Sequence, residues 1–140
     1  MDAALRTAVR RRARLRCEYC LLPENLASVV PFQVEHIVAR QHGGPTVLAN
    51  LALACHRCNL HKGPNLTGID PRTRRLIRLF HPRRMKWVRH FRWDGPYLVG
   101  RTPVGRATVA VLQMNHEERI GLRQALIEEG NFPPPTEGSK

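Results

Sequence analysis

Four polar residues between positions 35 and 59 have the types that hydrolysis of a phosphodiester bond requires. Such hydrolysis needs a base that deprotonates water and a cation that neutralises charge on the phosphate and the leaving oxygen. His36 suits the base, because an imidazole with a pKa of about 6.5 is mostly neutral at pH 7. Glu35 and Asn59 offer carboxylate and amide oxygens, which hard divalent cations accept as ligands. Asn50 can orient the imidazole through its side-chain carbonyl.

Glu35 and His36 are neighbours near the end of an expected strand, Phe32–Val38, and this sets a geometric condition. Successive side chains of a strand point to opposite faces. Both residues can therefore serve one site only if the strand ends or twists there. The loop QHGGPT that follows contains Gly-Gly and Pro, which break regular backbone and allow such a twist.

Four cysteines flank this segment as two C-x2-C pairs, Cys17/Cys20 and Cys55/Cys58, with 34 residues between the pairs. Two such pairs are an ordinary way to build a tetrahedral zinc site from four thiolates. The spacing exceeds that of a zinc ribbon, so other structure must fold between the pairs. Two redox disulfides are the alternative, which a reducing compartment disfavours. We expect one structural zinc ion held by all four cysteines.

Two helices are expected to flank the strand. The first covers residues 2–16, with Asp2 as a candidate N-cap, and carries six arginines. The second cysteine pair opens a helical turn or two that continues to about Lys62, where Gly63-Pro64 stops it. The basic face of the first helix is either a solvated surface or an arm that contacts phosphate, and the density of arginine favours the arm.

The C-terminal half is expected to form a β-meander followed by a helix. Strands are indicated over Arg75–Phe80 and Lys86–Trp93, and the second alternates aromatic and polar residues. Asp94-Gly95 is a hairpin signal that leads to a return strand over Pro96–Gly100. Asn115 to Glu129 reads as the final helix, with Asn115 as its N-cap. The fold class is therefore α+β.

The charge of the chain points to a polyanionic partner. Lys and Arg total 23 against 11 Asp and Glu, which gives a net charge of +12 and a pI of about 11.1. A domain this basic usually binds nucleic acid or an anionic membrane surface. Because no apolar run reaches the roughly 18 residues of a spanning helix, an integral membrane protein is excluded. The N-terminus does not read as a secretory signal, so we expect a cytoplasmic protein.

Basic residues concentrate in the second half of the chain. Between Asp70 and Asp94 no acid interrupts nine of them, interleaved with Trp and Phe as on nucleic-acid surfaces. The residues that we expect to contact phosphate are Arg40, Lys62, Arg83 and Arg84.

The segment from Cys17 to Lys62 resembles the HNH endonucleases, through CEYC, VEHIVARQHGG and ANLALACHRCNLHKG. The resemblance implies a ββα-metal core around one catalytic divalent cation, Mg²⁺, which Mn²⁺ or Ni²⁺ can replace. It implies that His36 activates water and that Asn50 positions this base and braces the loop. It also implies that Glu35 and Asn59 bind the cation and that the zinc is structural. Cleavage of DNA would then leave 5′-phosphate and 3′-hydroxyl ends.

The sequence departs from the common family pattern at two positions and leaves two roles open. Glu35 stands where Asp is common, and Asn59 stands where the name-giving pattern has His. His61 is either an additional ligand or a surface residue, and His42 either contacts DNA or belongs to the turn. The alternative function is a catalytically inactive, zinc-stabilised module that binds DNA or RNA. A weaker rival is a protein that docks on anionic membranes through its basic arm.

We expect a single domain over residues 1–140. Its parts are a basic helix (1–16), the zinc-stapled core (17–64), a basic extension with a terminal helix (65–130) and a tail (131–140). The apolar stretch from Phe91 to Met114 either completes the core or forms a homodimer interface. Sequence specificity, nicking against double-strand cutting, and the physiological role are not encoded in any motif that we recognise.

Overall fold

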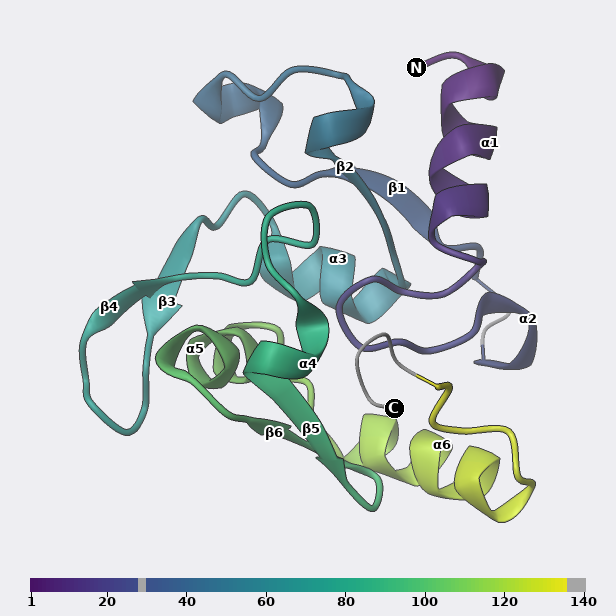
Figure 1. The fold of residues 1–140 in the computed structure, drawn as a ribbon, viewed down its shortest axis with the longest axis vertical. Coiled ribbons are helices and arrows are strands. Elements are labelled where there is room, and N and C mark those ends of the chain that lie inside the picture. The colour runs from purple at the N-terminus through teal and green to yellow at the C-terminus, as the bar shows by residue number, and fades with distance from the viewer. Residues whose placement is uncertain (28–29, 136–140) are drawn as a thin grey trace.

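The computed structural model describes residues 1–27 and 30–135. The chain begins with a basic helix (Figure 1). Helix α1 spans Ala3–Arg12, and the side chain of Asp2 accepts a hydrogen bond from the backbone N–H of Leu5 at 2.8 Å. This is the N-cap that the sequence predicts. The helix ends earlier than expected, because Arg14 and Leu15 adopt left-handed backbone conformations. A short helix, α2, follows at Glu24–Ala27.

The centre of the fold is an antiparallel hairpin with one helix packed against it. Strand β1 spans Gln33–His36 and pairs with β2, Leu51–Ala54, so that His36 lies opposite Leu51. The short helix α3, His56–Lys62, begins at Cys55 and stops at Gly63, as expected. Every residue of β2 is buried, because α1 contacts the hairpin and further elements cover the rest of it. The predicted strand and helix are thereby confirmed.

Two 3₁₀ turns, Arg40–His42 and Leu48–Asn50, shape the loop between β1 and β2. Gly43 follows the first turn with a φ of +83°, a left-handed conformation that glycine adopts without strain. At Gly44 a Cβ atom would lie 1.7 Å from the carbonyl oxygen of Val38. Only glycine fits there, so the Gly-Gly pair of the sequence closes this loop tightly.

The C-terminal extension is mixed in structure. Its elements are β3 (Thr67–Ile69), β4 (Leu76–Arg78), α4 (Trp87–His90), β5 (Phe91–Asp94), β6 (Tyr97–Gly100), α5 (Pro103–Val111) and α6 (Glu117–Glu128). Within the described residues β3 pairs with β4, and β5 pairs with β6, in separate two-stranded sheets. The α+β class with short antiparallel strand pairs is confirmed, although the strands do not join into one meander.

Three details of the extension differ from the sequence prediction. Trp87–His90 is a helical turn instead of a strand, and the indole N–H of Trp87 donates to the carbonyl of Tyr19 at 2.8 Å. Helix α5, which Thr102 caps, lies in a stretch that reads as β in the sequence. The cap of α6 is His116, because the side chain of Asn115 bonds to the backbone of Leu98 on β6.

One hydrophobic core joins the hairpin to the extension. Leu51 and Leu53 of β2 are fully buried in the same cluster as Phe91, Leu98 and Leu112 of the extension. The apolar stretch that ends at Met114 therefore completes the core, the first of its two expected roles. Among the described residues, no helix combines the length and apolarity needed to span a bilayer. Of the expected tail, only residues up to 135 are described.

Candidate active site and zinc centre

The four cysteines converge on one point in the core. Their sulfur atoms all lie within 4.8 Å of one another, and the four side chains are buried and not disulfide-bonded. Cys20 Sγ and Cys55 Sγ are 3.8 Å apart. A Zn–S distance of about 2.3 Å gives a tetrahedron with an edge of about 3.8 Å, so the spacing fits zinc. It is far longer than the roughly 2.05 Å of a disulfide, so the structure favours the zinc alternative.

Arg119 of α6 lies against these thiols, and sequence reasoning missed it. Its Nη2 is 2.9 Å from Cys58 Sγ and 3.9 Å from Cys55 Sγ, and the residue is only 7% exposed. Burial opposes the charged guanidinium, but the charges of the cysteines outweigh burial and raise the pKa of Arg119. Arg119, Arg123 and Leu126 form the buried i, i+4, i+7 face of α6. Two arginines at the helical spacing of a buried face were the signal in the sequence that could have pointed to a buried charged partner.

His36 lies at the end of β1 with its imidazole beside the following loop. Its Nε2 is 2.8 Å from Thr46 Oγ1, an exposed contact that no sequence pattern pointed to. Desolvation, Arg40 and the N-terminus all lower the pKa of His36. A lowered pKa favours the neutral form of the imidazole, which is the form that a general base requires.

Asn50 braces the loop through three hydrogen bonds. Its Oδ1 accepts from the N–H of Val38 at 2.9 Å, and its Nδ2 donates to the carbonyls of Val38 and Pro45 at 3.0 and 2.9 Å. Its backbone carbonyl accepts from the N–H of Ile37 at 2.8 Å. The expected contact between its side-chain carbonyl and the imidazole is thus wrong, because that oxygen is bonded to Val38. Asn50 holds the backbone of the loop that follows His36.

Glu35 is buried between the first cysteine knuckle and α3. Its carboxylate accepts hydrogen bonds from the hydroxyl of Tyr19 and, at 3.3 Å, from Nζ of Lys62. Burial raises the pKa of Glu35, and the charge of Lys62 and the hydrogen bond from Tyr19 act against this rise. Lys62 also donates to the carbonyl of Ile37 at 2.9 Å and is 2% exposed. The prediction that Lys62 contacts phosphate is therefore not supported, because its ammonium is used inside the protein.

Strand alternation places Glu35 and His36 on different sides of the hairpin. Glu35 and Gln33 both contact α3, since the amide of Asn59 donates to Gln33 Oε1, whereas His36 contacts Thr46 in the loop. Glu35 and His36 therefore contact different parts of the protein. Any phosphate that both residues serve must lie across the end of the strand.

Glu35 and Asn59 fit a catalytic cation by the chemistry of their oxygens. Both line the interface between β1 and α3. Among residues 1–27 and 30–135, the cysteine cluster is the only close group of three or more acidic, histidine or cysteine ligands. A cation here would thus have two protein ligands and would keep water or phosphate in its other positions. Mg²⁺ is bound in this manner in many phosphoryl-transfer enzymes.

The arginines expected to contact phosphate differ in availability. Arg40 and Arg84 are exposed, and the charge of Arg40 acts on His36. Arg83 is partly buried and forms an ion pair with Glu18. Burial and the charge of Arg12 lower the pKa of Arg83 to about 10.

A cavity of about 400 Å³ with a basic rim opens beside Arg83. It lies between the end of α1 and the segment from Pro82 to Val88. The basic residues that line it, here called the basic groove, are Arg12, Arg14, Arg16, Arg83 and Lys86.

The two histidines with open roles have different surroundings. His42 Nε2 is 3.1 Å from the carbonyl oxygen of Pro64, so His42 fastens the loop to the end of α3. This contact supports the turn role. His61 is partly exposed on α3, where burial together with the charges of Arg119, Arg57 and His116 lowers its pKa.

The comparisons with known proteins agree with this geometry. Residues 17–65 match the family model of the HNH endonuclease. The matched span contains both cysteine pairs, and the cysteines fit the zinc-knuckle subgroup. It also contains Glu35, His36, Asn50 and Asn59. Neither the curated proteins nor the solved structures gave a significant match. Residues 17–65 of the chain are therefore similar to an HNH endonuclease domain.

Proposed function

We propose that the protein is a metal-dependent endonuclease that hydrolyses phosphodiester bonds in DNA. The observation that carries the proposal is His36. It is a neutral histidine at the end of β1, with its ring held by the loop and Arg40 nearby, within the segment that matches the HNH endonuclease model. A base, a phosphate-binding cation and a braced loop are the parts that phosphodiester hydrolysis needs.

In the proposed reaction His36 takes a proton from the attacking water. In the tautomer with the proton on Nε2, this nitrogen donates to Thr46 Oγ1 and the lone pair of Nδ1 is free for that proton. Asn50 and Gly44 hold the loop that carries Thr46, which keeps the imidazole oriented before substrate arrives. Arg40 contributes positive charge beside the phosphate.

Glu35 and Asn59 are the proposed ligands of the catalytic cation. When bound, Mg²⁺ would supply charge that stabilises the phosphate and the leaving oxygen. Tyr19 and Lys62 fix the carboxylate of Glu35 at the interface with α3. Its position is thus set by the fold.

The buried pair of Glu35 and Lys62 supports a second candidate, an inactive module that binds DNA or RNA. Lys62 already neutralises the carboxylate that would otherwise attract a divalent ion. In that case the zinc-stabilised fold and its basic surface would bind nucleic acid without cutting it.

Incubation with supercoiled plasmid separates the two candidates. We expect nicked or linear product with Mg²⁺ or Mn²⁺ and none with EDTA. A single site cuts one strand, so nicked product should precede linear product unless two copies act together. Tight plasmid binding without cleavage in any of these metals would favour the inactive module.

Thr46→Val is expected to lower kcat about 10- to 100-fold and to leave KM nearly unchanged. The loss of the Oγ1 acceptor frees the imidazole to rotate and to change tautomer, whereas the DNA-binding surface is untouched. Thr46→Ser restores the hydroxyl and should recover most of the rate. Steady-state kinetics on a labelled duplex measure both variants. Equal losses in Thr46→Val and Thr46→Ser would remove Thr46 from the positioning role.

A further inference from the structure

We infer that Arg119 is part of the zinc centre and that zinc binding is what fastens helix α6 to the HNH domain. Nη2 of Arg119 donates a hydrogen bond to Cys58 Sγ across 2.9 Å, and the charge of the guanidinium strengthens and shortens such a bond. Its Nη1 donates to the carbonyl of Leu112 at 2.9 Å, so the guanidinium is held from both sides. This inference does not depend on the proposed nuclease activity.

Charge balance explains why a guanidinium lies here. Four thiolates around one Zn²⁺ carry a net charge of −2, and the four cysteines are buried. Such a charge is costly in a low-dielectric interior unless it is paired and hydrogen-bonded. Arg119 offers one positive charge and a directed N–H at this position. Groups that hydrogen-bond to metal ligands commonly change metal affinity by 10- to 100-fold.

The neighbouring arginine on α6 has a different role. Arg123, one turn further along, donates to the carbonyl of Pro96 at 2.7 Å and to Asn115 Oδ1 at 3.1 Å. Its guanidinium also lies over the ring of Trp93 at 5.3 Å. Arg123 is also buried, but its hydrogen-bond partners are oxygens instead of sulfur, which makes it a matched control for the hydrogen bond from Arg119 to Cys58.

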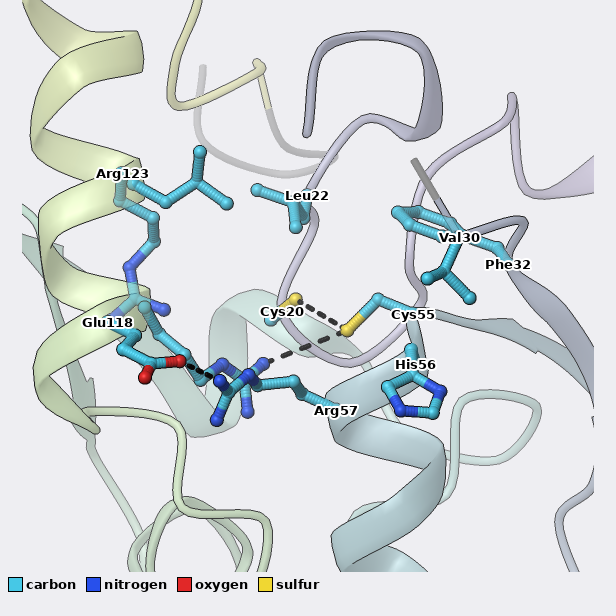
Figure 2. A pocket seen from close by; sticks show the side chains of 11 residues that line it. Cys20, Leu22, Val30, Phe32, Cys55, His56, Arg57, Glu118 and Arg123 are labelled. Atoms are coloured by element: carbon cyan, nitrogen blue, oxygen red, sulfur yellow. Dashed lines mark hydrogen bonds and ion pairs between the residues drawn. The ribbon is translucent and has the colours of Figure 1, made fainter. Parts of the chain in front are cut away.

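A second contact between α6 and the second cysteine knuckle lies at the surface. Arg57 of α3 forms an exposed ion pair with Glu118, and exposed pairs contribute little to stability. A cavity of about 240 Å³ lies between α6 and the knuckles, lined among others by Cys20, Cys55 and Glu118 (Figure 2). Close packing is therefore incomplete at this interface, and the hydrogen bond from Arg119 to Cys58 becomes more important for holding α6 in place. Because binding and folding are coupled in metal sites, removal of zinc should release α6.

The first test measures how fast zinc leaves the full-length protein. Elemental analysis should find one zinc per chain in the wild type. Arg119→Met should release zinc to a chromogenic chelator at least tenfold faster, Arg119→Lys should be intermediate, and Arg123→Met should match the wild type. Equal release from Arg119→Met and the wild type would overturn the inference, as would a protein that contains no zinc.

The second test uses the wild-type protein and so avoids variants that fail to fold. Hydrogen exchange is followed with zinc bound and after its removal by a chelator. The amides of Glu117–Glu128 should lose protection when zinc leaves, whereas those of Ala3–Arg12 should change less. Retained protection of α6 without zinc would contradict the coupling. Both tests leave DNA out, so their results stay separate from those of the plasmid assay.

Discussion

His36→Ala is expected to reduce plasmid cleavage by a factor of at least about 100 while DNA affinity changes less than threefold. A positioned general base typically contributes 10²- to 10⁴-fold to a rate, and alanine removes the imidazole that is proposed to accept the proton from water. The side chain is not part of the buried core, so the fold should tolerate its loss. Single-turnover cleavage of supercoiled plasmid in Mg²⁺ measures the rate, and fluorescence anisotropy measures binding.

The matched control is His56→Ala, which removes an exposed histidine at the start of α3. It should cut as the wild type does. Undiminished cleavage by His36→Ala would exclude His36 as the base. A parallel loss of binding would instead assign His36 to substrate contact.

Replacement of Arg14, Arg16 and Lys86 by alanine is expected to weaken binding of duplex DNA at least tenfold. These residues line the basic groove, together with Arg12 and the partly buried Arg83. Arg12 and Arg83 line the same groove, and the charge of Arg12 adds to burial in lowering the pKa of Arg83. Holding two positive charges close together costs free energy, and the negative charge of a phosphate backbone would offset that cost.

The control for charge is the triple replacement of Arg72, Arg74 and Arg75, exposed residues in the turn between β3 and β4. Both variants remove three positive charges, so they differ only in location. Salt titration of anisotropy, with His36→Ala as the parent to prevent cleavage, should show a slope that is shallower by about 0.9 for each phosphate that the groove no longer neutralises. Equal weakening in the two variants would mean that net charge alone drives binding.

The parts of the site that rest on spacing could be predicted from the sequence. The C-x2-C pairs place two thiols on each knuckle, and Asp2, Gly63 and Gly44 impose local conformations that few other residues allow. These are short-range rules. The strand at β1 and the helix at α3 followed from the same kind of information.

The parts that rest on long-range contacts could not be predicted. Whether Lys62 faces solvent or Glu35 depends on how α3 packs on the hairpin. Trp87, Phe91 and Trp93 have the spacing of a strand face, but ring packing, with centroids 5.2 and 5.8 Å from that of Trp87, bends the chain into a helical turn there. Arg119 meets its sulfur partner across 61 residues, beyond the reach of any local pattern.

The shared core has a consequence for protein engineering. Leu51 and Leu53 of β2 belong to the same buried core as Phe80, Phe91 and Leu112, which lie beyond position 79. A fragment cut at residue 65 would expose apolar residues of its own β1–β2 hairpin. Moving this hairpin and its cysteine cluster into a fusion protein would thus require the extension as well, since the extension contributes to the same core.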